Sequence, residues 1–281
     1  MRLHPWALAA WSAAGLAVAL ASSSPAYRAV VLGAGAVMLA VGGTRAGVAR
    51  RPLAIAIGAA WIGAVALNLL LSHTGATVLV TLPAWLPLVG GQLTFEAAAF
   101  GADTGLGIAA CVLVVAPLAW QLAPDELLDA VPRHLESIGA ALATTLALAP
   151  GLARSYRAVV EAQTMRGWRP RGLRSWADVL VPVALTAMED SLLAAEAMEA
   201  RAFGSGPRTR AQGLGWRPAD GLTAAVAVLA AAAFVGARAA GLQEDWLTYP
   251  TLGAPPADAV LLVAASLLWL PPVLLWLRSR G

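Results

Sequence analysis

Two short segments of the chain repeat one pattern of charged, small and aromatic residues. EAQTMRGW at 161–168 and EAMEARAF at 196–203 both read Glu-Ala, three residues, Arg, a small residue and an aromatic residue, and they begin 35 residues apart. The guanidinium of Arg166 or Arg201 is a planar fork of five N–H donors, which suits carboxylates and backbone carbonyls at an interface. A plainer reading of one copy is an arginine in the last helical turn, where it interacts with the helix dipole. Two copies in register favour two helix ends that dock into matching pockets of a dimeric soluble partner.

The sequence has no lysine and shows no arrangement of residues that is typical of an enzyme site. All 19 basic residues are arginine, so a P-loop lysine and Schiff-base chemistry are both excluded. The single cysteine and three scattered histidines show no metal-ligand spacing. Glu189 and Asp190 are neighbours and point to different helix faces, so they form no carboxylate dyad. We therefore expect no catalytic residues, no metal and no cofactor, and we attribute the pI near 9.7 to cytoplasmic arginines and not to nucleic-acid binding.

The composition predicts an all-α, polytopic membrane protein. Hydrophobic residues make up 59% of the chain and charged residues only 12%, too few for a surface that faces only water. Thr94 is a candidate N-cap for the apolar segment at 97–121, and Glu96 lies in its first turn, where a negative charge is favourable. A bilayer core needs about 20 apolar residues per helix. About six spans satisfy this requirement: 6–22, 27–43, 53–71, 97–121, 221–241 and 257–277.

The distribution of arginine predicts the orientation of the spans. The arginines that lie at the span ends of one side are Arg2, Arg45, Arg50, Arg51, Arg278 and Arg280. The loops at 72–93 and 242–256 contain no arginine. The positive-inside rule then places both termini in the cytoplasm. Arg28 and Arg238 are exceptions, each near a span end from which arginine can extend to the interface.

The central segment differs from the spans. Ten of the 19 arginines lie between 154 and 217, and the span count puts this segment on the cytoplasmic side. Two long helical runs are expected at 135–167 and 175–203, ended by Gly167 and Gly204 respectively. We divide the chain into N-terminal transmembrane helices at 1–122, cytoplasmic or interfacial coupling helices at 123–220, and C-terminal transmembrane helices at 221–281.

These segments carry a resemblance to a known family. The doubled pattern resembles the transmembrane T component of energy-coupling-factor (ECF) transporters, the cobalt-transport permease family, which carries an Ala-Arg-Gly-type signature at the end of each of two coupling helices. Here the signatures read Met165-Arg166-Gly167 and Ala200-Arg201-Ala202. LTFEAAAFG at 93–101 and APDELLDAV at 123–131 are also similar to family positions, so the likeness runs from about 93 to 210.

The resemblance implies a coupling subunit in a bacterial cell membrane. Such a subunit binds two cytoplasmic ABC-type ATPase subunits through its coupling helices, and it also holds a membrane-embedded S component that binds a vitamin or a transition-metal ion. Met165 stands where the first signature usually has Ala. Ala202 stands where the second usually has Gly, so a left-handed cap at Ala202 would be strained, and Gly204 is the alternative position for it.

Two groups of residues follow from the resemblance and the helical spacing. The expected ATPase-docking residues are Arg166, Gly167, Arg201, Ala202, Glu161, Gln163, Glu196 and Glu199. The four polar members other than the arginines are equally compatible with solvated positions. The residues expected to pack helix on helix or against the S component are Leu152, Tyr156, Val159, Met188 and Leu192, and ordinary packing is the usual role of such apolar stripes.

Two other classes of membrane protein were compared with this interpretation. A lipid-modifying membrane enzyme would need paired carboxylates for a metal, and Asp220 at the start of a span has no second acidic residue one turn later. A stand-alone secondary transporter would have ionisable groups or broken helices near the bilayer midplane. Asp103 is the one candidate of that kind, and it lies near the outer end of its span. Uptake by the chain alone, without ATPases, would indicate such a transporter.

Overall fold

The computed structural model describes residues 3–42, 50–83, 90–122, 136–170, 172–203, 215–242 and 244–280. These residues are mostly helical, as expected. The chain divides into two units, unit 1 with Met1–Ala123 and Leu214–Gly281, and unit 2 with Pro124–Gly213. The expected boundary after residue 220 falls within the first turn of a unit 1 helix, α8 (Pro218–Ala239), so the last segment starts earlier than its hydropathy suggests.

Unit 1 contains helices long and apolar enough to cross a membrane. Four candidate spans are present in the part of the chain that the structure describes: Arg51–Leu71, Phe95–Gln121, Pro218–Ala239 and Ala259–Leu277. The first three correspond to α3 (Arg50–Leu71), α4 (Phe95–Gln121) and α8, and the fourth covers α9 (Ala259–Ser266), η3 (Leu267–Trp269) and most of α10 (Leu270–Arg280). Unit 1 also contains two shorter apolar helices, α1 (Pro5–Ala21) and α2 (Pro25–Val41).

Helix starts follow local sequence signals. The Thr94 hydroxyl accepts a hydrogen bond from the Ala97 backbone N–H at 3.3 Å, which confirms the expected N-cap of α4. Proline occupies the first turn of α1, α2 and α8, where its missing N–H costs nothing. Asp220 in α8 accepts from the Arg217 backbone N–H at 3.0 Å and from that of His4 at 3.1 Å. Its buried carboxylate thus caps α8 and joins this helix to the start of α1.

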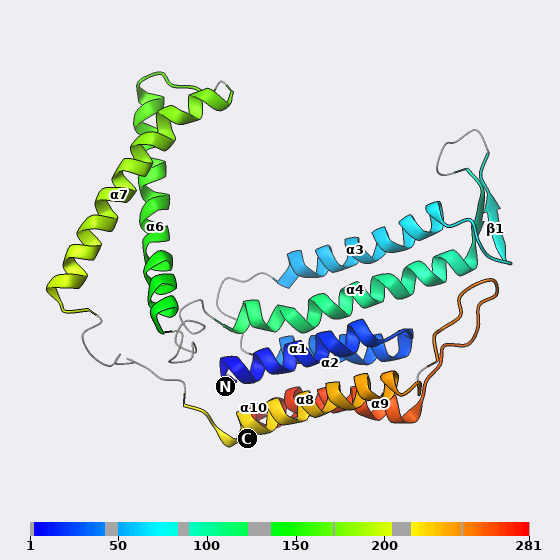
Figure 1. Cartoon of the computed structure of the whole chain (residues 1–281). Coiled ribbons are helices and arrows are strands. Elements are labelled where there is room, and N and C mark those ends of the chain that lie inside the picture. The colour runs from blue at the N-terminus through cyan, green and yellow to red at the C-terminus, as the bar shows by residue number, and fades with distance from the viewer. Residues whose placement is uncertain are drawn as a thin grey trace. The chain divides into compact units, whose positions relative to one another are not determined.

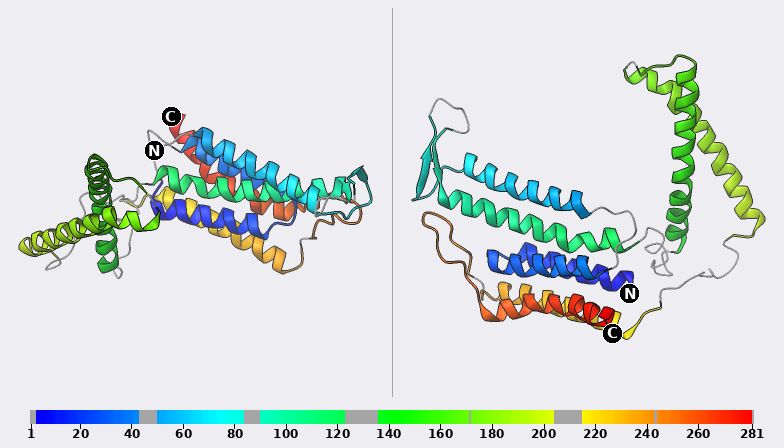
Figure 2. Two further views of the ribbon diagram at one scale, coloured as in Figure 1. Left: turned by 90° about the horizontal axis from the view of Figure 1, so that it is seen from above. Right: turned by 180° about the vertical axis from the view of Figure 1, so that it is seen from behind.

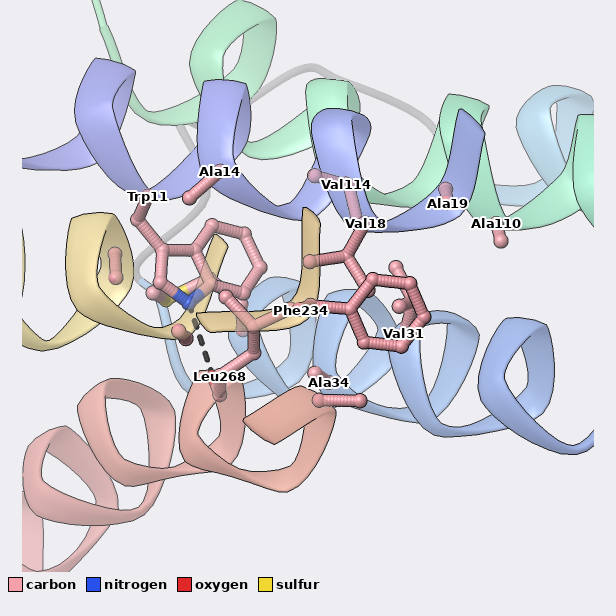
Figure 3. Close-up of a cluster of buried hydrophobic side chains, with 14 of the residues drawn as sticks. Trp11, Ala14, Val18, Ala19, Val31, Ala34, Ala110, Val114, Phe234 and Leu268 are labelled. Carbon is pink, nitrogen blue, oxygen red and sulfur yellow. Dashed lines mark hydrogen bonds between the residues drawn. The ribbon is translucent and has the colours of Figure 1, made fainter. Parts of the chain in front are cut away.

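The core of unit 1 lies between α1, α2, α4, α8 and the α9–α10 segment. Trp11 and Phe234 are fully buried there, and the Trp11 indole N–H donates to the Leu268 carbonyl at 3.0 Å (Figure 3). The ring of Tyr27 meets that of Phe234 edge-on, with centroids 5.4 Å apart. The Tyr27 hydroxyl accepts a hydrogen bond from the Asp258 backbone N–H at 2.8 Å. Buried indole and phenol groups therefore have partners, as they must in an apolar interior.

Glycines of α4 bring α3 close to it. A Cβ on Gly101 would lie 2.8 Å from the Val65 Cα, and one on Gly105 would lie 2.6 Å from the Trp61 ring. These glycines are four residues apart on one face of α4, the arrangement that lets membrane helices approach closely. The Trp61 indole N–H donates to the Ala102 carbonyl at 3.1 Å across the same interface. The rest of the α3 surface is largely exposed, as expected for a helix surrounded by lipid.

A short β hairpin follows α3 and was not expected from the sequence. Strand β1 (Val78–Thr81) pairs antiparallel with β2 (Gln92–Thr94). The buried Glu96 carboxylate accepts from the Thr77 backbone N–H at 3.0 and 3.2 Å, and the Phe95 N–H donates to the Thr77 carbonyl at 3.0 Å. The first turn of α4 therefore holds the hairpin in place, within a segment interpreted above as a loop.

The helix ends of unit 1 fall at two opposite ends. The start of α1 and the end of α10 lie at one end, together with the end of α4 and the start of α8, where the chain leaves for unit 2 and returns (Figures 1 and 2). The β hairpin and the connection between α8 and α9 lie at the other end. We call these the terminal end and the hairpin end of unit 1.

Unit 2 consists of two long helices and the turn that joins them. They are α6 (Glu136–Met165) and α7 (Ala177–Ala200), and the short helix η2 (Leu173–Trp176) precedes α7. The bounds of α6 and α7 agree with the two expected helical runs to within three residues at each end. The short helix η2 was not expected as a separate element. The helices are antiparallel neighbours, so the C-terminal end of α6 lies near the start of α7 (Figure 1).

Candidate functional site: two arginine-tipped helix ends

The first copy of the repeated pattern, Glu161–Trp168, forms the C-terminal end of α6 and is called the first tip below. Arg166 follows the last helical residue. Gly167 has a left-handed backbone with φ of 85°. Its N–H donates to the Thr164 carbonyl at 3.0 Å, and the Trp168 N–H donates to the Gln163 carbonyl at 2.9 Å. This pair of hydrogen bonds around a left-handed residue is the Schellman motif, a common way for a helix to end.

The second copy, Glu196–Phe203, forms the C-terminal end of α7 and is called the second tip. Arg201 caps the helix with φ of −92°, and Ala202 follows with a left-handed φ of 52°. The Ala202 N–H donates to the Glu199 carbonyl and the Phe203 N–H to the Met198 carbonyl, both at 2.9 Å. The two tips therefore have the same backbone path, with each arginine at the same position in it.

Ala202 is the one described residue other than glycine with a positive φ. The sequence offers Ala202 and Gly204 as alternative positions for a left-handed cap, and the left-handed residue is Ala202. Gly204 lies outside the described residues. A left-handed conformation costs an L-residue with a Cβ about 1–2 kcal/mol, so the second tip holds its shape against a local preference.

The charged side chains of the tips are exposed. Arg166, Glu161 and Thr164 are exposed on the first tip, and Arg201, Glu196 and Glu199 are exposed on the second. Within the part of the chain that the structure describes, no hydrogen bond or ion pair occupies either guanidinium. Both arginines are therefore available to a binding partner.

Gln163 and Trp168 join the first tip to the start of α7. The Gln163 side-chain amide donates to the Asp178 carbonyl at 3.1 Å. The Trp168 indole N–H donates to the Ser175 carbonyl at 2.9 Å, and its ring meets that of Trp176 edge-on with centroids 5.9 Å apart. Gln163, one of the expected docking residues, thus makes a hydrogen bond within unit 2. Neither contact could be read from helical spacing, because both partners lie across the turn.

These contacts determine how far apart the tips are. The first tip is attached to residues 175–178 at the beginning of α7, and the second tip is the end of α7. Because α7 has 24 residues, and an α-helix rises about 1.5 Å per residue, the tips lie roughly 36 Å apart along it. This separation is too large for one small pocket and suits two separate binding sites.

The five residues expected to pack fall into two groups. Tyr156 and Val159 are partly buried in unit 2, as ordinary helix packing requires. Leu152, Met188 and Leu192 are exposed, with 46%, 65% and 64% of their surface accessible. The buried contacts of α7 in this unit come instead from Val179 and Val183. The three exposed residues therefore leave an apolar surface that unit 2 itself does not cover.

Unit 1 contains a largely buried ion pair that was not predicted from the sequence. Arg28 of α2 pairs with Asp103 of α4, and its guanidinium also donates to the carbonyls of Asp103 and Ser22, both at 3.0 Å. The Arg28 side chain is 19% exposed and that of Asp103 is 7% exposed. Arg28 thus turns inward, contrary to the expectation that it extends to the interface. The available signal was that both residues are charged and occur in otherwise apolar helices.

The second exceptional arginine is also paired. Arg238 near the end of α8 donates to Asp245 and to the hydroxyl of Ser23, both at 3.2 Å. Both arginines of the hairpin end thus contact the turn between α1 and α2 and have an aspartate partner.

No protein-family model matches this chain, and no curated protein matches it.

Proposed function

We propose that this chain is the transmembrane coupling (T) subunit of an ECF-type ABC importer. The observation that supports this most is a pair of arginine-bearing caps with the same backbone hydrogen bonds, one at the C-terminal end of α6 beside the start of α7 and one at the C-terminal end of α7, about 36 Å apart by the rise of an α-helix. Each cap presents one exposed guanidinium in the same backbone setting. Two exposed arginine side chains in matching helix ends, at a separation fixed by α7, suit a partner with two related subunits, such as a pair of ABC-type ATPases.

The proposed subunit crosses the membrane six times. Besides the four candidate spans, α1 and α2 have 17 residues each, or about 26 Å of helix, and much of their surface is buried among the other helices. Helices surrounded by protein tolerate a length slightly below the usual 30 Å of a bilayer core. With six spans, both termini lie on the same side.

The terminal end faces the cytoplasm in this proposal. Arg50 and Arg51 begin α3, Arg217 precedes α8, and Arg278 and Arg280 end α10, all at the terminal end. At the hairpin end the two arginines are neutralised by aspartates. The excess positive charge at the terminal end agrees with the positive-inside rule. Unit 2 follows α4 and precedes α8 in the chain, and in this proposal both tips lie in the cytoplasm with the ATPases.

The residues have distinct roles in this proposal. Arg166 and Arg201 bind the two ATPase subunits, and Gly167 and Ala202 give each tip its shape. Glu161, Glu196 and Glu199 border the docking surfaces. Leu152, Met188 and Leu192 contact the membrane-embedded S component, which carries the vitamin or transition-metal ion. ATP hydrolysis moves the tips, and α6 and α7 transmit this movement to the S component.

Arginine substitutions test the proposal. Arg166→Ala and Arg201→Ala should each weaken association with the ATPase subunits by about 2–5 kcal/mol, the usual cost of removing one partner of a buried charge-assisted contact at an interface. Arg154→Ala is the matched control, because Arg154 is exposed on the same helix, four residues from Pro150, and away from the tip. Binding would be measured with the purified full-length chain in nanodiscs. ATPase recovery with the double variant at the wild-type level would contradict the proposed role.

A stand-alone secondary transporter is supported by one observation. The Arg28–Asp103 ion pair joins the apolar helix α2 to the candidate span α4 and is largely buried, and such groups often mark a transport path. Uptake into vesicles that contain only this chain would favour that alternative. Under the coupling proposal, uptake requires the ATPases, an S component and ATP, and the chain alone transports nothing.

A further inference from the structure

The two tips share a backbone path but expose different apolar side chains. Met165, just before Arg166 in the first tip, is 79% exposed. Its counterpart in the second tip is Ala200, a residue with little apolar surface. Phe203, just after Ala202 in the second tip, is 63% exposed. The first tip therefore exposes an apolar residue before its arginine, and the second tip exposes one after it.

The difference before the arginine is one of residue type, and the difference after it arises from the contacts of Trp168. This residue occupies the position of Phe203 in the first tip, but its ring packs on Trp176 and its N–H donates to Ser175. The aromatic residue of the first tip thus holds the tip against α7 and is partly buried. The aromatic residue of the second tip has no ring partner among the described residues, and most of its surface is left for another molecule to cover.

We infer that the two tips dock into pockets of different shape, the first tip through Arg166 and Met165 and the second through Arg201 and Phe203. This inference rests on the proposed function. Each pocket combines a carboxylate or carbonyl acceptor for the guanidinium with an apolar cavity. The first cavity receives a flexible thioether, which adapts to irregular surfaces. The second receives a rigid aromatic ring, a residue type that often contributes most of the binding energy at protein interfaces.

Charge favours a protein as the partner of Phe203 over an anionic lipid surface. Glu196 and Glu199 are exposed in the last turns of α7, against the single arginine of the tip. Acidic groups are repelled by the anionic lipids of a cytoplasmic leaflet. Arg208 and Arg210 follow in the sequence, outside the described residues, so the experiment includes a membrane arm.

Hydroxyl-radical footprinting tests the inference on the full-length chain. Oxidation of Met165, Phe203 and Trp168 would be measured in zwitterionic nanodiscs, with and without the two ABC-type ATPase subunits. We expect ATPase binding to slow oxidation of Met165 and Phe203 severalfold and to leave Trp168 unchanged. Equal protection of Trp168 and Phe203, or no protection of Phe203, would overturn the inference. Protection of Phe203 by anionic nanodiscs without ATPase would also overturn it, because lipid would then be its partner.

Substitutions separate this inference from the proposed function. Phe203→Ala should weaken ATPase binding about tenfold or more, and Phe203→Leu should restore most of the loss, because a large apolar side chain is retained. Leu193→Ala is the matched control, since Leu193 is 64% exposed on α7 away from the tip. If the wild-type chain binds no ATPase, both proposals fail. If the wild type binds and Phe203→Ala binds equally well, only the inference of different pockets fails.

Discussion

Substitution of the left-handed residue in each tip, Ala202→Gly and Gly167→Ala, should change the stability of the two helix caps in opposite directions. Ala202 adopts a left-handed φ of 52° that costs an L-residue about 1–2 kcal/mol, and glycine adopts it without that cost. Because glycine loses more backbone entropy on ordering, we expect Ala202→Gly to stabilise the second cap by a net amount of about 1 kcal/mol. This corresponds to roughly a fivefold change in the equilibrium between closed and open caps.

The opposite substitution in the first tip should have the opposite effect. Gly167 has a φ of 85°, and a Cβ added to it would meet no atom within 4 Å. The cost of Gly167→Ala is therefore conformational and not steric. We expect the first cap to lose about 1 kcal/mol, or roughly fivefold in its closing equilibrium.

Hydrogen–deuterium exchange at single-amide resolution measures both effects. The Phe203 N–H reports the second cap, because it donates to the Met198 carbonyl, and the Trp168 N–H reports the first cap, because it donates to the Gln163 carbonyl. Ala202→Gly should slow exchange of the Phe203 amide about fivefold, and Gly167→Ala should accelerate that of Trp168 by a similar factor.

A third variant shows whether glycine acts through the cap. Ala200 is the last helical residue of α7, where glycine costs about 0.5–1 kcal/mol, so Ala200→Gly should accelerate exchange of the Phe203 amide. Slower exchange in Ala202→Gly but not in Ala200→Gly would support the left-handed geometry. If Ala202→Gly leaves the Phe203 amide unchanged or accelerates its exchange, Ala202 is not left-handed and the two caps are not equivalent.

Three further predictions concern unit 1 and are measured by thermal unfolding in detergent. Arg28→Ala or Asp103→Ala should destabilise the protein by about 3–5 kcal/mol, since each leaves a buried charge unpaired. Replacing both residues with leucine should recover much of this loss. Full stability of the single variants would argue against the buried pair. Gly101→Ala should lower the free energy of unfolding by about 1–3 kcal/mol, because the added Cβ would meet the backbone of α3. Gly63→Ala, whose Cβ would have no atom within 4 Å, should be neutral or slightly stabilising. Equal effects of the two substitutions would contradict the α3–α4 packing. Asp220→Ala should cost about 1 kcal/mol or more by removing the cap of α8 and the acceptor for His4, and Asp220→Asn, which keeps one acceptor oxygen, should cost less.

Local features of the fold could be predicted from the sequence because they depend on neighbouring residues. Apolar runs defined the helices of unit 1, and the Thr94 cap follows from a hydroxyl placed three residues before an N–H. The helical bounds in unit 2 follow from the Gly167 stop and from the spacing of apolar residues. The hairpin was missed because its strands have four and three residues, too few for a periodic pattern.

Contacts between distant residues could not be predicted in the same way. Arg28 and Asp103 lie 75 residues apart, and a single sequence shows only that each is unusual in an apolar helix. The Trp168–Ser175 hydrogen bond crosses a turn whose path depends on the left-handed Gly167. The repeated pattern predicted two arginine-bearing helix ends, but it left the left-handed position of the second end open between Ala202 and Gly204. It also did not show that Trp168 is held against α7 while Phe203 is exposed, because that difference depends on contacts across the turn.

The strain at Ala202 bears on why the two helices end alike. A Schellman cap is a common helix end, so its presence on both tips would carry little weight if both had glycine. In the second tip the cap is present with alanine at the left-handed position. An extended backbone after Arg201 would have ended the helix without this strain. Strained backbone of this kind tends to persist where the surrounding structure or a function requires it. The left-handed turn at Ala202 lies between Arg201 and Phe203, and both side chains are exposed at the end of α7. A binding surface that requires the guanidinium of Arg201 and the ring of Phe203 together explains why this strained turn persists.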